Sequence, residues 1–315
     1  PTVMSGGPLP LLGSGYRVGH GDTIILESCE YCNSFLSFFP TVAVILDIEA
    51  DHLDFFKDLE DVEKSFRTFA DLVPEDGVIV ANRDDENTMH TLEGEARPMV
   101  TFGLEEGDVH AANLTWSRGL PTFDVIWKGQ PFAHVSLRVP GEHNVKNALA
   151  AAASAIVLGM PAKAVEEGLS AFRGAARRFE HKGSYHGAEV YDDYAHHPGE
   201  LKALLSAVSG LGYDRIICAF QPHTYSRTKA LFDDFVQVLR EPDVTLLAEI
   251  FAAREDNTIG ISSRDLAAQI PGSRYFATLP ELTDALAELA QPGDLILTVG
   301  AGDIYRAGEK LLEKD

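Results

Sequence analysis

Short runs of β-branched and aliphatic residues recur along this 315-residue chain, and they constrain its fold more than any other feature. The runs read TIILES, TVAVILDI, GVIVAN, RIICAF, VTLLAEI and DLILTVG. Stretches with helical spacing separate several of them; one is 61–73, whose apolar face carries Val62, Phe66, Phe69 and Val73. Strands that alternate with helices are typical of parallel α/β sheets. The sequence therefore predicts an α/β fold.

Three segments depart from this alternation. Residues 122–139 alternate polar and apolar side chains around the turn sequence WKGQP, which predicts an antiparallel excursion. The alanine-rich run in PGEHNVKNALAAAASAIVLG predicts a long helix. The segment GAARRFEHKGSYHGAEV then interrupts the pattern with three glycines and a charge cluster. We place a domain boundary there, which gives domains at 1–175 and 176–315.

Length and charge limit the kind of protein this is. The chain is long enough for two hydrophobic cores. A formal net charge of −22 would repel polyanions, so we expect no nucleic-acid partner and no anionic membrane surface. No run of 18 apolar residues and no signal-like leader is present, and three cysteines are too few for a disulfide scaffold. These features predict a cytoplasmic protein.

Acidic side chains and a histidine follow two of the predicted strands. Glu27 and Glu30 come after TIIL, and Asp51 and His52 come after TVAVILDI. Ligands of open α/β sheets bind outside the carboxyl ends of the strands. A carboxylate from one strand end and an imidazole from the next can hold a divalent cation, and Mg²⁺ prefers oxygen ligands. The same residues also fit a solvated loop.

Two cysteines lie in a C-x-x-C spacing within the first of these clusters. A structural zinc site needs about four ligands, and no second C-x-x-C occurs. A redox pair needs a lowered thiol pKa, whereas the flanking glutamates would raise it. We therefore predict that Cys29 and Cys32 fill space around a strand end, and that Cys218 lies in a buried strand.

Two further polar clusters lie in the second half of the chain. YDDYAHHPGEL, at 191–201, fits general acid and base work, a zinc site, or a loop before a helix that begins at Pro198. In FQPHTYSRTKALFDDF, at 220–235, a strand passes into a helix with Ser226 or Thr228 as the candidate cap. His223 and Arg227 would then lie at a helix N-terminus, which suits a carboxylate or phosphate, although an ordinary capped helix is an alternative.

The glycines near the C-terminus do not form a dinucleotide fingerprint. In DLILTVGAGDIYRAGEK the third glycine position holds Tyr305, so we interpret G-x-G as a structural turn between a strand and a helix. The chain also contains no G-x-x-x-x-G-K-[ST] motif.

Six stretches in this order resemble the Mur ligase family. They are ESCEYCNSFLSFFPTVAVILDIEADHLDFF, VPGEHNVKNALAAAA, RRFE, VYDDYAHHPGEL, FQPHTYSRT and DLILTVGAGDI. The resemblance implies a central ATPase-type α/β domain, incomplete at its N-terminus, followed by a Rossmann-like C-terminal α/β domain. It also implies that a UDP-binding N-terminal domain and a P-loop precede Pro1 in the full-length chain.

The resemblance implies an ATP-dependent amide-forming ligase of peptidoglycan synthesis, which serves cell-wall biogenesis, cell shape and cell division. ATP would phosphorylate UDP-N-acetylmuramate with Mg²⁺ as cofactor, and the amine of L-alanine would attack the acyl phosphate. Lacking the P-loop, the isolated chain is expected to be inactive. The alternatives are a murein tripeptide ligase, a non-catalytic nucleotide-binding module, and a metal hydrolase centred on DDYAHHP.

The family's motifs also imply roles for individual residues of the first domain. Glu27 and His52 match the magnesium ligands. Asn147 matches a contact to adenine, and His143 lies beside it. Asp47 departs from the commoner spelling NIEADH and adds a negative charge near the metal.

In the second domain, Arg178 and Asp193 match residues that reach the phosphate and ribose of ATP. The acyl-phosphate and amino-acid pocket would be lined by Tyr194, His196, His223 and Arg227. Of these substrate-binding residues, His196, His223 and Arg227 would be catalytic. Thr224 departs from the family pattern, since many relatives have arginine there.

Overall fold

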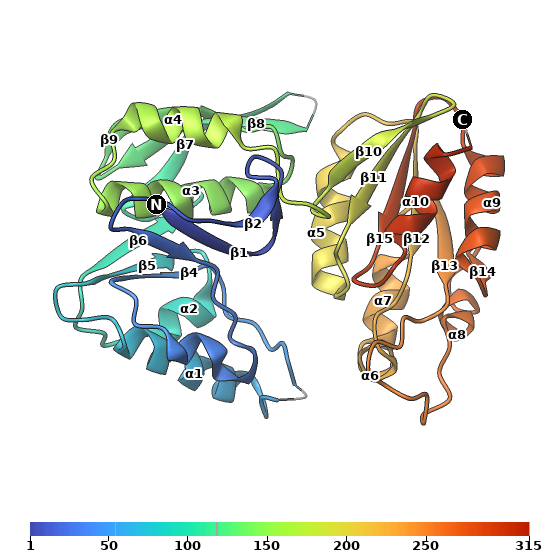
Figure 1. The fold of residues 1–315 in the computed structure, drawn as a ribbon, viewed down its shortest axis with the longest axis horizontal. Helices are drawn as coiled ribbons and strands as arrows, with labels where there is room; N and C mark the ends of the chain where they lie inside the picture. The colour runs from blue at the N-terminus through green and yellow to red at the C-terminus, as the bar shows by residue number, and fades with distance from the viewer. Residues whose placement is uncertain (54, 118, 315) are drawn as a thin grey trace. The chain divides into compact units, whose positions relative to one another are not determined.

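The chain forms two compact α/β units (Figure 1). The computed structural model describes residues 1–53, 55–117 and 119–314. Contacts between residues divide the chain into Pro1–Arg173 and Gly174–Asp315, so the division lies just before the predicted boundary at 175.

The main sheet of the first unit has six strands in the order β4-β5-β6-β7-β8-β9. The strands are β4 (Val42–Ile45), β5 (Val78–Asn82), β6 (Met99–Gly103), β7 (Val109–Ser117), β8 (Leu120–Trp127) and β9 (Gln130–Ser136). Strands β4 to β7 pair in parallel, whereas β7, β8 and β9 pair antiparallel. The predicted antiparallel excursion is confirmed, and Lys128 and Gly129 make its turn with φ of 48° and 74°.

Helices cover both faces of this sheet. Helices α1 (Leu59–Asp71) and α2 (Glu86–Thr91) pack on one face, and α3 (Glu142–Val157) packs on the other; α4 (Ala162–Ala171) packs on β9. Strand β5 shows why both faces are apolar. Ile79 and Ala81 join the core beneath α1, while Val80 between them joins the core beneath α3, because side chains alternate along a strand.

A separate three-stranded sheet opens the chain, in the order β2-β1-β3. Its strands are β1 (Thr2–Leu9), β2 (Ser14–Arg17) and β3 (Ile24–Leu26), and the 3₁₀ helix η1 (Tyr31–Ser37) follows. The composition of the glycine- and proline-rich opening segment did not predict β1 and β2. TIILES does contain a strand, but Ile24, Ile25 and Leu26 are exposed.

The second unit is built on one six-stranded sheet in the order β10-β11-β15-β12-β13-β14. The strands are β10 (Glu180–Tyr185), β11 (Ala188–Asp193), β12 (Arg215–Phe220), β13 (Val244–Ala248), β14 (Arg274–Phe276) and β15 (Asp294–Val299). The helices are α5 (Pro198–Ser209), α6 (Tyr225–Ala230), α7 (Phe232–Val238), α8 (Ser263–Ala267), α9 (Leu279–Leu289) and α10 (Tyr305–Leu312). All strand pairs are parallel except β10 with β11.

Both faces of this second sheet are also buried. On β12, Cys218 and Phe220 pack against α5, α7 and α8, while Ile217 and Ala219 pack against α9 and α10. The helix predicted to begin at Pro198 is confirmed as α5. This three-layer arrangement confirms the predicted α/β class for the C-terminal half.

The insertion of β15 between β11 and β12 positions the functional residues of this unit. The backbone N–H of Gly300 donates to the carbonyl of Asp193 at 3.0 Å. The turn after β15 therefore lies beside the polar residues that follow β11.

In the part of the chain that the structure describes, no helix is long and apolar enough to cross a membrane.

Candidate functional site

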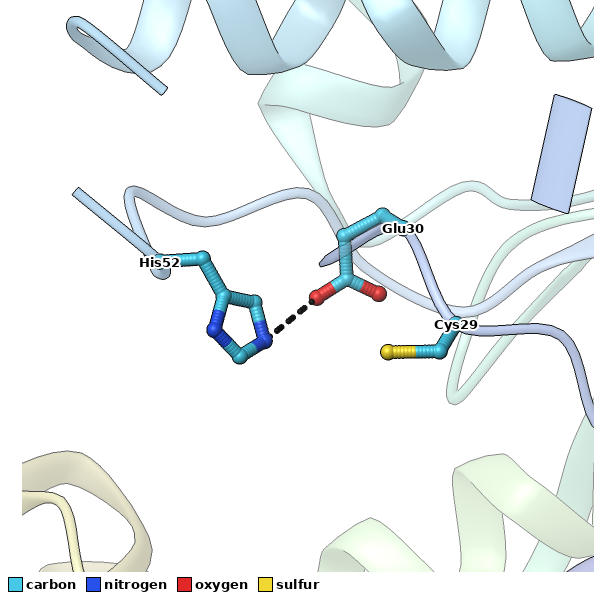
Figure 2. Close-up of side chains that lie close together, drawn as sticks. All are labelled: Cys29, Glu30 and His52. Atoms are coloured by element: carbon cyan, nitrogen blue, oxygen red, sulfur yellow. Dashed lines mark ion pairs between the residues drawn. The ribbon is translucent and has the colours of Figure 1, made fainter. Parts of the chain in front are cut away.

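One polar cluster forms where β3 and β4 end. Glu30 follows β3, and His52 follows β4. The His52 Nε2 lies 3.2 Å from Oε1 of Glu30 (Figure 2). The ring of Tyr31 packs against the imidazole with a centroid separation of 4.7 Å. The two strand ends thus meet although β3 and β4 belong to different sheets.

The described hydrogen bonds of Glu27, which the sequence predicted to face His52, are made with strand β1. The Oε2 of Glu27 accepts hydrogen bonds from the Ser5 hydroxyl at 2.9 Å and the backbone N–H of Gly6 at 2.7 Å. The reason is the register of β3, which pairs in parallel with β1 and carries Glu27 past its end toward Ser5 and Gly6. Glu30, rather than Glu27, makes the described contact with His52. The metal role of Glu27 stays a prediction.

Negative charge accumulates around this cluster. The pKa of Asp47 is raised, first by desolvation and then by the carboxylates of Glu49, Asp85 and Glu30, while Lys146 acts in the opposite direction. A cation would relieve this mutual repulsion. Oxygen donors with a single imidazole also suit a hard cation, so the residues present fit Mg²⁺.

Two of the three thiols occupy different surroundings from those predicted. Cys29 and Cys32 are both exposed, so the prediction that they fill space around a strand end is wrong. Desolvation, opposed by a backbone hydrogen bond from Tyr31, raises the pKa of Cys29, and Glu30 and Glu27 add to this rise. Cys218 is fully buried as predicted, and burial raises its pKa to about 12.

The predicted adenine contacts lie at the start of α3. His143 and Asn147 are one helical turn apart and are both exposed on the same face. The side chain of Asn144 approaches Nε2 of His143 to 3.1 Å. This face of the helix is therefore reachable from solvent.

In the second unit, three predicted pocket residues come together at the carboxyl ends of β11 and β12. The rings of His196 and His223 are edge-to-face with centroids 5.9 Å apart, and the ring of Tyr194 is 5.4 Å from that of His196. The Nδ1 of His196 lies 3.0 Å from the carbonyl of Tyr194 and 3.4 Å from Oε2 of Glu200. The two histidine rings therefore lie side by side.

His223 has an unusual environment. Its ring stacks on Phe251 at 5.7 Å, and its Nδ1 is buried with no hydrogen-bond partner among the described residues. Desolvation lowers its pKa to about 4, and His196 and Arg227 contribute in the same direction. The imidazole is therefore neutral near pH 7 and can accept or donate one hydrogen bond to a bound group.

The helix after β12 begins differently from the prediction. Helix α6 starts after Thr224, which has a φ of 65° and makes no side-chain cap. Ser226 is bonded to Glu255 through both its backbone N–H and its hydroxyl, and the Thr228 hydroxyl donates to the Thr224 carbonyl. Neither Ser226 nor Thr228 is the cap, so that prediction is wrong.

Asp193 is a buried anchor. Its two carboxylate oxygens accept the backbone N–H groups of Phe179 at 2.7 Å and Ala195 at 2.8 Å, and desolvation raises its pKa to about 6. Arg178, by contrast, is exposed; its guanidinium is 5.7 Å from the Tyr194 ring and 3.8 Å from Glu200. Asp193 thus fixes the turn that presents Arg178.

Sequence reasoning missed Arg177, whose only signal was the doubled arginine in RRFE. Its Nε lies 2.8 Å from Asp192, and its terminal nitrogens donate to the carbonyls of Gly300 at 2.7 Å and Gly302 at 3.2 Å. The rings of Tyr194 and Tyr305 lie 5.0 and 4.7 Å from the guanidinium.

The contacts of Arg177 and Asp193 also bear on the proposed hydrolase. Arg177 engages Asp192, and backbone amides engage Asp193. Within the described ranges, DDYAHHP does not form a cluster of potential metal ligands. The geometry therefore gives the hydrolase alternative no support.

Two family models cover most of the chain. The Mur ligase middle domain matches residues 18–155, and the Mur ligase, glutamate ligase domain matches residues 177–302. Among solved structures, the chain is similar to the UDP-N-acetylmuramate-alanine ligase MurC from Thermotoga maritima, with a TM-score of 0.82 and 27% identity over 100% of this chain and 68% of that one. MurF from Acinetobacter baumannii, at 20% identity and a TM-score of 0.76, shares the fold and covers 99% of this chain and 69% of its own.

Curated relatives are closer in sequence. The UDP-N-acetylmuramate–L-alanine ligase of Caldanaerobacter subterraneus is 44% identical over 321 residues, which cover 100% of this chain and 70% of the relative. The enzyme of the same name from Clostridium novyi is 44% identical over 99% of this chain and 69% of its own length. With this similarity along its whole length and both domain models in order, the chain belongs to the Mur ligase family.

Proposed function

We propose that this chain forms the central and C-terminal domains of an ATP-dependent ligase that joins L-alanine to UDP-N-acetylmuramate through an acyl phosphate. The observation that carries the proposal is the 44% identity, over the entire chain, to relatives named for that reaction. Nucleotide use is supported by a structure of the same fold, MurF ligase from Thermotoga maritima, which was solved in complex with ADP.

The first unit would supply the metal and adenine contacts. Glu27 and His52 are the proposed ligands of Mg²⁺, which when bound would neutralise charge on the phosphoryl group in transfer. The exposed face of α3 that carries His143 and Asn147 would contact the adenine.

The second unit would supply the substrate pocket. Arg227 is suited to hold the carboxylate of the incoming amino acid by a charge-assisted pair. His223, neutral because its pKa is about 4, can hydrogen-bond the amine or acyl group without adding charge repulsion. Tyr194 and His196 would complete the wall of this pocket. Arg178 is proposed to reach the phosphates of ATP, and Asp193 the ribose.

The test is phosphate release by the full-length protein with ATP, UDP-N-acetylmuramate and L-alanine. We expect turnover that requires all three substrates. The 315-residue chain alone should show none, because it contains no G-x-x-x-x-G-K-[ST] motif to hold the phosphates. Robust turnover by the chain alone would overturn that part of the proposal.

The second candidate is the murein tripeptide ligase, which uses the same sugar nucleotide. The spellings CEYCNSF and HTYSRT favour the L-alanine enzyme. Direct competition between L-alanine and the tripeptide on the full-length protein separates the two, since the true substrate will dominate the product. A non-catalytic module would release no phosphate with either.

A further inference from the structure

Three donor atoms of different chemistry converge at the carboxyl ends of β3 and β4. The Sγ of Cys29, a carboxylate oxygen of Glu30 and a ring nitrogen of His52 all lie within 4.8 Å of one another, and among the described residues this is the only such group (Figure 2). We infer that Cys29, Glu30 and His52 form a binding site for a borderline-soft divalent ion, Zn²⁺ above all, which shares His52 with the proposed magnesium site but adds a thiolate ligand.

The donor set decides which metal is preferred. Thiolate and imidazole select zinc and related transition metals, whereas Mg²⁺ prefers carboxylate, carbonyl and water oxygens. Three protein ligands and an open position match the usual ligand count of a non-structural zinc site. A further carboxylate is close, since Oδ2 of Asp51 lies 3.9 Å from Nε2 of His52.

An ion can reach this cluster from solvent. Cys29 is exposed, and the side chains of His52 and Glu30 are 26% and 28% exposed. Binding would replace the present contact between His52 and Glu30 with bonds from both to the metal, and the thiol would release one proton to solvent as the metal–sulfur bond forms. No oxidant or reductant is involved.

The site is not a C-x-x-C metal pair. Cys32 has a left-handed backbone, with φ of 54° and ψ of 26°, and its thiol is not a member of the cluster. It is exposed like Cys29 and three residues away, so it provides a matched control. Cys218 is buried in β12 and does not compete.

The consequence for activity rests on the proposed function. His52 would serve both metals, so zinc bound to Cys29, Glu30 and His52 would withdraw a ligand from Mg²⁺. Zinc is therefore expected to inhibit ligation in competition with Mg²⁺, and the Cys29→Ser variant is expected to resist that inhibition.

Binding can be tested on the 315-residue chain without any ligase assay. The chain, reduced with a phosphine, is titrated with Cd²⁺, and the ultraviolet sulfur-to-metal charge-transfer band is recorded; Zn²⁺ affinity is then measured by competition with a chelator. We expect one ion per chain and a band that survives Cys32→Ser but disappears in Cys29→Ser. Zinc affinity should fall by at least about 100-fold in Cys29→Ser, beyond the effect typical of an outer-shell change. His52→Ala should keep the band but weaken binding.

Several results would overturn the inference. The inference fails if the parent chain shows no charge-transfer band, or if Cys29→Ser and Cys32→Ser lose the band equally. It also fails if the zinc affinity of His52→Ala is unchanged. Circular dichroism of each variant checks that it is folded. If the binding results hold but the full-length protein shows no ligation, the proposed function fails and the metal site stands.

Discussion

The imidazole rings of His196 and His223 lie edge-to-face with centroids 5.9 Å apart, although they follow different strands. Strand β15 separates β11 from β12 in the sheet, and the loops after β11 and β12 meet above its end. The proximity of His196 therefore contributes to lowering the pKa of His223, after the larger effect of desolvation.

His223 should stay neutral well below the usual titration range of histidine. In an NMR titration of the histidine ring protons, the resonance absent from His223→Asn should change only near pH 4. The unfolded chain binds this proton near pH 6.5, so the free energy of unfolding should fall as pH drops between these values. A resonance that titrates near pH 6.5 would contradict the buried environment described for His223.

The titration of Asp193 should change the free energy of unfolding in the opposite direction over a similar pH range. Its pKa of about 6 in the folded chain exceeds the unfolded value of about 3.9, so the folded state binds the extra proton between them. The free energy of unfolding should therefore fall as pH rises through this window, and Asp193→Asn should remove that slope. Urea denaturation of the parent chain and the variant at several pH values gives the difference in their unfolding free energies. The contribution of His223 cancels in this difference, because both proteins contain it. Identical slopes would show that Asp193 is not desolvated.

Arg177 should contribute far more to stability than its neighbour Arg178. Replacing Arg177 by alanine leaves the buried Asp192 carboxylate uncompensated, and we expect a loss of about 3–5 kcal/mol. Arg178→Ala is the matched control, with an expected change within about 0.5 kcal/mol, because its ion pair with Glu200 is long and exposed. Both tryptophans, Trp116 and Trp127, lie in the first unit, so denaturation should be followed by far-ultraviolet circular dichroism. Equal losses of unfolding free energy in Arg177→Ala and Arg178→Ala would contradict the prediction that Arg177 contributes more to stability.

Gly300 is expected to tolerate no side chain. Its φ is 145°, and a Cβ there would lie 2.5 Å from the carbonyl oxygen of Gln221. Gly300→Ala should therefore cost about 1–3 kcal/mol in unfolding free energy. Gly210 ends α5 with ordinary helical φ and ψ and open space around it, so Gly210→Ala should change stability by less than about 0.5 kcal/mol. A harmless Gly300→Ala would mean that the turn after β15 is not tightly packed.

Glu27 should be essential in the full-length enzyme without being essential for folding. Glu27→Gln retains the size of the side chain near Ser5 and Gly6 but removes the charge that we propose binds Mg²⁺. Loss of several kcal/mol of metal-derived stabilisation should slow phosphate release by about a thousandfold or more. Cys32→Ala serves as the control and should retain activity. Normal turnover by Glu27→Gln would remove Glu27 from the metal site and leave Glu30 as the alternative partner of His52.

Local sequence determined the elements of this fold and the order of its motifs. The runs TVAVILDI, GVIVAN, RIICAF, VTLLAEI and DLILTVG form strands, because β-branched and aliphatic residues fit a pleated, buried surface. The helix predicted around 61–73 forms as α1, and its start is shifted to the residue after Asp58, which caps it. The six collinear stretches also identified the family correctly.

Tertiary structure decided which side chains meet. The spacing of Glu27, Cys29 and Glu30 does not show which of them faces His52, because that depends on the pairing of β3 with β1 and on the turn into η1. Likewise, RRFE contains two adjacent arginines, and only the position of β15 assigns Arg177 to the buried pair and leaves Arg178 exposed. Hydrophobic periodicity is a local property with a short repeat, whereas the convergence of polar side chains depends on strand order and register, which are set by contacts far apart in the chain.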